Sequence, residues 1–210
     1  VHTRTGNAKW LNEIAHSNPL WIHTSDAARL GIELGDLVRV STEIGHFVVP
    51  AWVTEGIRPG VVACSHHMGR WRVAEAEGMD RWSSALVRLT ESGDGRWRMR
   101  RVHDVEPFAS ADADSGRVWW RSAGVHQNLT FPVHPDPISG AHAWHQKVSV
   151  AKAQPGDQEG DIEVDTGRAH EIYKEWILKA RPGPGPDGMK RPHWLLRPLR
   201  PVHDAYRAET

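Results

Sequence analysis

Histidine is the first residue type that suggests chemistry in this chain, since 14 of its 210 residues are histidines. Six of them form a close pair and a looser cluster: His66 and His67, then His126, His134, His142 and His145. Imidazole nitrogens bind zinc, most often from helix positions that bring two ligands to one face near a carboxylate. These histidines are instead expected in loops, without an acidic residue at a matching spacing. Hydrogen-bonding roles are therefore favoured, and no metal ligand is predicted.

Nucleophilic catalysis has equally little support. The single cysteine, Cys64, ends an apolar run, where a thiol usually behaves as a small hydrophobic side chain. Ser65 lacks the G-x-S-x-G motif of a nucleophile elbow, and no Walker-type or G-x-G-x-x-G phosphate loop is present. One cysteine forms no internal disulfide and holds no iron–sulfur cluster or thiolate zinc site. The sequence therefore predicts no catalytic residue of its own.

Composition excludes several classes of partner. Lys and Arg number 26 against 26 Asp and Glu, so the formal net charge is zero, which argues against a nucleic-acid coat or a polybasic membrane arm. No apolar run approaches the ~20 residues of a transmembrane helix. Residues 1–10 lack the three regions of a signal peptide. The sequence thus predicts no nucleic-acid partner and no transmembrane segment, and it leaves the cellular compartment open.

Polar loops are the feature most consistent with binding. Residues 3–9 place two hydroxyls, a guanidinium, a carboxamide and an ammonium around one glycine. Such a set suits a heterocycle or a pyrophosphate that is approached by main-chain N–H groups. Similar loops are expected at residues 65–71, 127–128 and 145–147. Loops at one end of a small barrel commonly bind ligands, so these four segments are candidate binding loops.

The elements that would carry these loops are mainly strands. Apolar runs bounded by turn residues predict strands at residues 20–23, 37–40, 46–53 and 61–64. A short helix is expected at 27–30, with Thr24 or Ser25 followed by Asp26 as its N-cap and Gly31 as its end. This order of elements predicts a small barrel.

Residues 72–122 have a different character and are interpreted as an insertion. Large apolar and charged residues alternate at 86–90 and 96–100 around a turn at 91–95, which predicts a β-hairpin. Barrel-like sequence resumes at residues 125–150. The predicted domains are therefore a barrel over residues 1–150, with this insertion, and a separate region over 151–210.

The region beyond residue 150 has its own pattern. Residues 153–161 are predicted to be a polar linker. A stripe at helical spacing follows, formed by Ala169, Ile172, Trp176 and Ala180. The Pro-Gly run at 181–186 ends that helix. Residues 190–206 are basic, aromatic and rich in proline, so they predict an extended tail that docks on another surface.

Several motifs in this order resemble a known family. The first block reads RTGN at 4–7, WL at 10–11, NPLWIH at 18–23, DAARLGI at 26–32, GDLVRV at 35–40 and IRPGVV at 57–62. A second block reads NLT at 128–130, DPISG at 136–140 and VSV at 148–150. Together they resemble the C-terminal molybdopterin dinucleotide-binding domain of the dimethyl sulfoxide reductase family of molybdenum oxidoreductases. The resemblance covers neither residues 72–122 nor the chain beyond about 151.

This resemblance implies a six-stranded double-psi β-barrel with short helices, an inserted hairpin, and a C-terminal helix with an extended tail. Its loops would hold one of two molybdopterin guanine dinucleotides. Carried over by position, the implied cofactor-binding residues are Arg4, Thr5, Gly6, Asn7, His66, His67, Asn128, His145 and Gln146. Several relatives have a lysine where His145 and Gln146 stand, which is a departure from the family pattern.

In that family the molybdenum ligand and the cysteines for any iron–sulfur cluster lie upstream of this domain. The resemblance therefore implies a part of an oxidoreductase that is inactive alone. Its partners would be the upstream domains and an iron–sulfur electron-transfer subunit.

Two other functions remain open. The main alternative is a double-psi barrel that acts as a protein-interaction module and docks through its basic, Pro-rich tail. The least favoured is a histidine metalloenzyme, which needs three histidines within ligand distance of one point.

Overall fold

The structure is a computed structural model, and it describes residues 11, 14–66, 68–69, 71–73, 85–102, 124–134, 142, 145–178, 181–182 and 190–191. The chain divides into two compact units. The first comprises residues 1–131 and 147–167, and the second comprises residues 132–146 and 168–210. Each unit is described by itself.

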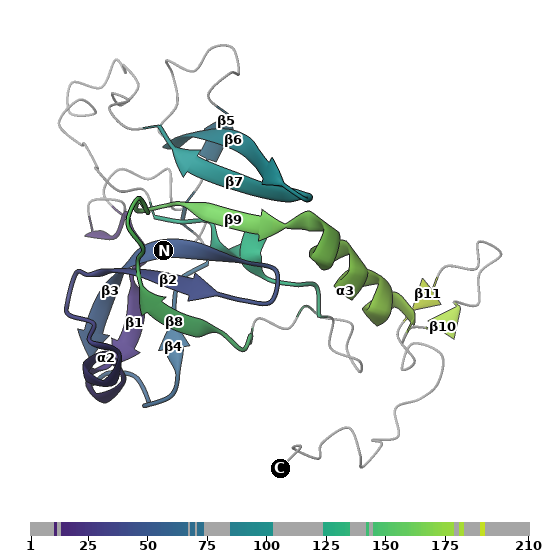
Figure 1. Cartoon of the computed structure of the whole chain (residues 1–210). Helices are drawn as coiled ribbons and strands as arrows, with labels where there is room; N and C mark the ends of the chain where they lie inside the picture. Colours follow the sequence, from purple (N-terminus) through teal and green to yellow (C-terminus); the bar gives the residue numbers. More distant parts are fainter. Residues whose placement is uncertain are drawn as a thin grey trace, which may run out of the picture. The chain divides into compact units, whose positions relative to one another are not determined.

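The first unit is built on a nine-stranded mixed sheet (Figure 1). Its strands are β1 (Leu20–His23), β2 (Leu37–Ser41), β3 (Gly45–Thr54), β4 (Val62–Ala63), β5 (Trp71–Val73), β6 (Ala85–Gly93), β7 (Arg96–Arg101), β8 (Ser149–Lys152) and β9 (Ile162–Asp165). The main path runs β4-β1-β3-β9-β7-β6-β5, and β2 pairs with β3 and β8. The mainly β prediction is confirmed.

The described strands form an open sheet, so the expectation of a closed six-stranded barrel is not met by them. Strand β3, with 10 residues, pairs with three strands: β1, β2 and β9. Its C-terminal half pairs in parallel with β1, where Leu20 lies opposite Ala51. Its N-terminal half pairs antiparallel with β9, where Phe47 lies opposite Ile162. Because β9 also pairs with β7, the sheet continues into the hairpin.

The predicted hairpin is confirmed as β6 and β7. Asp94 and Gly95 at its turn have φ of 52° and 75°, the left-handed values that a tight hairpin turn requires. The register shifts between Glu91 and Gly93, which marks a β-bulge. β6 also pairs in parallel with β5. The hairpin is therefore an extension of the main sheet.

Helix α2 (Thr24–Leu30) follows β1 directly. Its N-cap is His23, whose Nδ1 accepts from the Ser25 backbone N–H at 3.1 Å, so the expected cap at Thr24 or Ser25 is wrong. An imidazole nitrogen fills the role usually taken by a hydroxyl or carboxylate. Gly31 ends the helix with φ of 66°, as predicted. Asp26 instead accepts from Gly60 N–H at 2.6 Å and joins α2 to the turn before β4.

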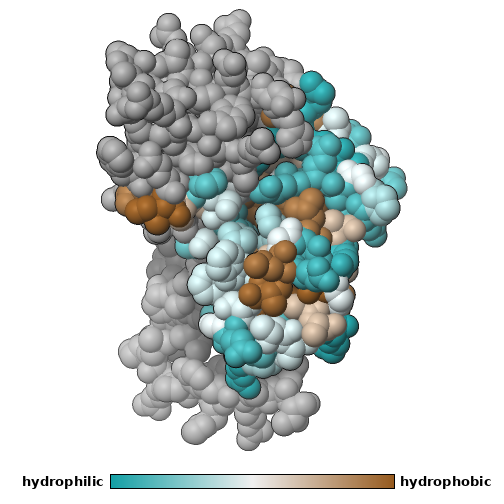
Figure 2. Space-filling view, turned by 90° about the vertical axis from the view of Figure 1, so that its left-hand side faces the viewer, coloured by the Kyte–Doolittle hydropathy of each residue, from teal (hydrophilic) through white to brown (hydrophobic). Residues whose placement is uncertain are grey.

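The core of the first unit follows the alternation of its strands. Val38, Val40, Phe47 and Val49 are almost fully buried on one face of β2 and β3. Residues of β1, α2, β6, β7 and β9 complete this core: Leu20, Ile22, Ala27, Val87, Met99 and Ile162. The outer surface on the α2 side shows small apolar patches among polar residues (Figure 2). Val48, on the opposite face of β3, is also buried, so the middle of β3 is covered on both faces.

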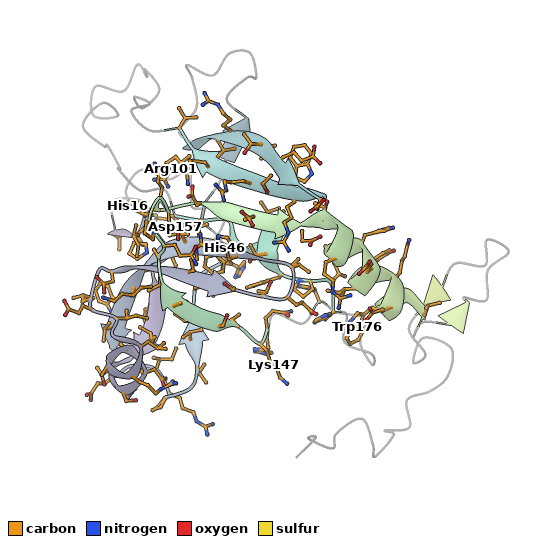
Figure 3. The ribbon with its side chains drawn as sticks, in the orientation of Figure 1. His16, His46, Arg101, Lys147, Asp157 and Trp176 are labelled. Carbon is orange, nitrogen blue, oxygen red and sulfur yellow. The ribbon has the colours of Figure 1, made fainter. Side chains whose placement is uncertain are left out.

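The segment predicted as a polar linker has a defined structural role. Asp157 accepts two hydrogen bonds from Arg39 of β2, and Asp161 accepts two from Arg100 of β7. Figure 3 shows Asp157 in this segment near His46 of β3. These ion pairs hold the turns that lead into β9, a strand that the sequence did not predict. Its four residues alternate over too short a run to stand out.

The second unit contains most of helix α3 (Thr166–Leu178). The helix predicted from Ile172 and Trp176 is confirmed, and Ile172 is buried. His134 and Trp176 have ring centroids 5.1 Å apart. β10 (Arg181–Pro182) and β11 (Lys190–Arg191) pair antiparallel. Ala180 and most of the predicted tail at 190–206 lie outside the described residues.

Among the helices that the structure describes, none combines the length and apolar character needed to cross a membrane.

Candidate functional site

Two polar loops of the first unit are joined by the side chain of Asn18, which precedes β1. Its Nδ2 donates to Ser65 O at 2.6 Å, just after β4. The same nitrogen donates to Val125 O and Gln127 Oε1, both at 2.9 Å. Its Oδ1 accepts from the Val125 N–H at 2.7 Å. One carboxamide therefore connects the loop after β4 to the segment around residue 125.

Gln127 also bonds to the residue that follows β4. It lies in the 3₁₀ helix η4 (Gln127–Thr130), and its Nε2 donates to Cys64 O at 2.8 Å. The Cys64 thiol in turn donates to Asn18 O at 3.1 Å. The Asn18 and Gln127 side chains are only 2% and 1% exposed. A buried side-chain amide stabilises the fold only when its polar atoms are hydrogen-bonded, and both the Asn18 and the Gln127 carboxamides are.

Two glycines allow the loops to approach each other. Gly69 has φ of +74°, and a Cβ there would lie 2.1 Å from His126 N. Gly124 also has φ of +74°, and a Cβ there would lie 2.4 Å from Asn18 Oδ1. A side chain at either position would force the loops apart. The close contact between them therefore depends on glycine.

Asn128, the next residue of η4, behaves differently from Gln127. Its Oδ1 is buried, yet no residue that the structure describes donates a hydrogen bond to it. A buried carboxamide oxygen without a donor costs free energy of about 1–3 kcal/mol. An N–H group of a bound heterocycle would satisfy it.

Two titratable groups beside these loops, His126 and Cys64, are neutral near pH 7. Burial lowers the pKa of His126, while a hydrogen bond with the Met68 backbone opposes the shift. Burial raises the pKa of Cys64 to about 12, so its thiol stays protonated. A protonated thiol is a poor nucleophile. The arrangement is therefore suited to hydrogen-bonding a ligand and not to activating Cys64.

The predicted site residues fall into three groups. Asn128 lies in η4, and His66 is exposed in the turn after β4. His145 and Gln146 belong to the second unit, where His145 is exposed and Gln146 half-buried. The remaining five lie outside the described residues: Arg4, Thr5, Gly6, Asn7 and His67. The cofactor-binding roles of all nine remain predictions.

The sequence offered little sign of the Asn18–Gln127 connection. Asn18 stood in a motif of the family resemblance, and Gln127 stood in a candidate binding loop. Neither position showed that the two carboxamides would be buried together, because they are 109 residues apart.

The part of the chain with described side chains contains no group of three His, Cys, Asp or Glu residues that could hold a metal ion.

The fold and the loops define a class: a mainly β, mixed-sheet domain that presents neutral hydrogen-bonding groups from adjoining loops, as ligand-binding domains do. Residues 1–92 match the family model described as the Molydopterin dinucleotide binding domain. Residues 1–92 are therefore similar to the molybdopterin dinucleotide-binding domains found in molybdoenzymes of the dimethyl sulfoxide reductase family. The resemblance stated from the sequence is confirmed.

Curated relatives agree with this assignment. The chain is 44% identical over 62 residues to a putative dimethyl sulfoxide reductase catalytic chain of Halobacterium salinarum, which is 30% of this chain and 7% of the relative. It is 34% identical over 99 residues to ArrA, the molybdopterin-containing chain of the arsenate respiratory reductase of Chrysiogenes arsenatis, covering 43% and 12%.

A third relative is the dimethyl sulfoxide reductase DmsA of Escherichia coli, 34% identical over 91 residues, covering 43% of this chain and 11% of the relative. The chain thus spans only about a tenth of the length of the relatives that it matches.

Proposed function

We propose that this chain is the C-terminal cofactor-binding part of a molybdenum-dependent oxidoreductase and that it holds one molybdopterin guanine dinucleotide. The family match over residues 1–92 supports a dinucleotide ligand. The names of three relatives, two dimethyl sulfoxide reductases and one arsenate respiratory reductase, support an oxidoreductase parent. The upstream domains would supply the metal ligand and any iron–sulfur cluster, and the chain alone would be inactive.

The buried Oδ1 of Asn128 is the single observation that carries the proposal. It lies one residue from the Asn18–Gln127 connection, in the helix expected to face the cofactor. Pterin and guanine rings both carry N–H donors that can reach such an acceptor. A carboxamide also offers Nδ2 as a donor to ring acceptors. The donor set of this region therefore fits the proposed group.

The residues proposed to hold the dinucleotide have distinct tasks. Asn128 would accept from a ring N–H, and His66 would contact the ligand from the loop after β4. Arg4, Thr5, Gly6, Asn7 and His67 would add further contacts, and His145 and Gln146 of the second unit are proposed as cofactor contacts from the family resemblance alone. When bound, the dinucleotide carries the molybdenum at which two-electron chemistry occurs. The residues of this chain bind and orient it.

The proposed fold of the complete domain is a six-stranded double-psi barrel over residues 1–150, with the insertion at 72–122. The parallel pairing of β1 with β3, separated only by α2 and β2, supports it. A simple meander would pair its neighbouring strands antiparallel. An iron–sulfur electron-transfer subunit would be a partner.

Anaerobic titration of the 210-residue chain with molybdopterin guanine dinucleotide tests this proposal. We expect saturable binding at one equivalent, weaker binding of GDP, and no binding of ADP at the same concentration. Loss of discrimination between GDP and ADP would contradict the guanine form. Absence of binding by the whole dinucleotide would contradict the proposed function.

A further inference from the structure

We propose that Asn18 and Gln127 are positioning residues, which hold the loop after β4 and helix η4 together so that Asn128 faces the ligand. This inference rests on the proposed function. Neither side chain is expected to touch the cofactor, since both are almost fully buried among protein atoms. We call the two carboxamides, with their partners on Cys64, Ser65 and Val125, the carboxamide clamp.

The clamp replaces strand pairing where the sheet provides none. β4 has only two residues, and the segment at 124–126 is irregular. Four main-chain groups of these segments are bonded by the two side chains: Cys64 O, Ser65 O, Val125 O and Val125 N–H. Buried main-chain groups need such partners. These four bonds therefore hold the loop after β4 and the segment at 124–126 in a fixed position relative to each other.

The position of Gln127 determines the direction of Asn128. In a 3₁₀ helix, adjacent residues project about 120° apart around the axis. Gln127 bonds to Asn18 and to the Cys64 main chain, so the rotation of η4 is fixed. Thr130 Oγ1 donates to Gln127 O at 2.8 Å and holds the same turn. The orientation of Asn128 therefore depends on contacts made by its neighbour.

The glycines show how little freedom the arrangement has. The backbone of Gly69 lies against Val125 and His126, and Gly124 lies against the Asn18 carboxamide. The clamp thus joins segments that are already in van der Waals contact. A small rotation of either amide would break several bonds at once.

The test compares three variants of the 210-residue chain. Gln127→Met keeps the length of the side chain and removes both amide atoms, and Asn18→Ala removes the central bonds. Asp161→Asn is the matched control, since Asp161 is 4% exposed and pairs with Arg100 of β7. For each we would measure affinity for molybdopterin guanine dinucleotide, amide hydrogen exchange and the midpoint of denaturant unfolding.

We expect Gln127→Met to bind the dinucleotide about tenfold more weakly, because Asn128 would no longer be held toward the ligand. A tenfold loss of affinity corresponds to the loss of about one buried hydrogen bond, here the bond between Asn128 and the ligand. Amide exchange should rise at residues 64–66 and 124–126 and stay unchanged in β2 and β3. Asp161→Asn should unfold at a lower denaturant concentration and bind as the unaltered chain does. This separation of affinity from stability distinguishes positioning from general support of the fold.

Equal affinity of Gln127→Met and the unaltered chain would overturn the positioning role and leave the proposed function standing. Failure of the unaltered chain to bind would overturn both. If neither clamp variant folds, amide hydrogen exchange in the unaltered chain tests whether the clamp forms. The Val125 N–H, which lies outside every strand, should then exchange as slowly as β3 amides, and fast exchange would overturn the clamp.

Discussion

Arg39 and Asp157, which are 118 residues apart in sequence, form a double hydrogen-bonded ion pair. Arg39 Nε donates to Oδ2 and Nη2 donates to Oδ1, both at 2.6 Å. Asp157 also accepts from the Gln154 N–H at 2.6 Å. The two side chains are 21% and 8% exposed. This geometry anchors the turn before β9 on β2, and it makes residues 153–161 an integral part of the sheet.

Breaking this pair should destabilise the first unit. Arg39→Gln and Asp157→Asn should each lower the free energy of unfolding by about 1–2 kcal/mol, because a partly buried charge loses its partner. The double variant should lose less than the sum of the two. Urea unfolding of the four chains checks this. Strictly additive losses would mean that the two side chains do not stabilise each other.

Acid should weaken the fold through the same carboxylate. The Arg39 guanidinium lowers the pKa of Asp157, and the Gly60 N–H lowers that of Asp26. Lys152 likewise lowers the pKa of Asp36. A carboxyl whose pKa is lower in the folded state stabilises it above the unfolded value of about 3.9, and this stabilisation is lost as the pH falls further.

We therefore expect the free energy of unfolding to fall as the pH is lowered from about 4 through the folded pKa values of these groups. Asp157→Asn should show a smaller fall than the unaltered chain. Urea unfolding between pH 6 and pH 3 measures both. An equal pH dependence in the two chains would contradict the role given to Asp157.

The sequence predicted those parts of the fold whose signals are local. The hairpin of β6 and β7 was evident from alternation around Asp94-Gly95, and the end of α2 from Gly31. The N-cap at His23 was missed, because capping by imidazole has no strong sequence signature. β9 was missed because its identity depends on Arg39 and Arg100, which anchor its turns from distant strands.

The contact between β3 and β9 depends on a single glycine. A Cβ at Gly45 would lie 2.0 Å from Glu163 O of β9. Gly45→Ala should therefore lower the free energy of unfolding by about 1–3 kcal/mol, as overpacking usually does. Gly56→Ala is the control, because a Cβ there meets only Thr54 Oγ1, at 3.3 Å. Similar unfolding midpoints for the two variants would refute this explanation.

The thiol of Cys64 should be unusually resistant to alkylation. Burial raises its pKa to about 12, so at pH 8 it holds roughly a thousandfold less thiolate than a thiol with pKa near 9. Mass spectrometry after iodoacetamide treatment reports this directly, since the chain has one cysteine. Modification should require denaturant. Rapid alkylation of the folded chain would show that the loop after β4 opens readily.

The candidate site was predictable only in part. Asn128 was identified through a family resemblance, and its buried oxygen agrees with a binding role. The clamp was not foreseen, because the pairing of Asn18 with Gln127 depends on how β1, β4 and η4 meet in space. Sequence spacing gives no information about carboxamides that bond across such distances.

Asn128→Ala gives the most direct test of the central claim, with affinity and stability measured on the same protein. Removing a buried acceptor that no described residue satisfies should leave the free energy of unfolding unchanged or raise it by up to about 1 kcal/mol. Anaerobic titration with molybdopterin guanine dinucleotide should show affinity weakened about tenfold. Unchanged affinity, together with a loss of stability, would instead make Asn128 a structural residue and contradict the assignment of this region as the cofactor site.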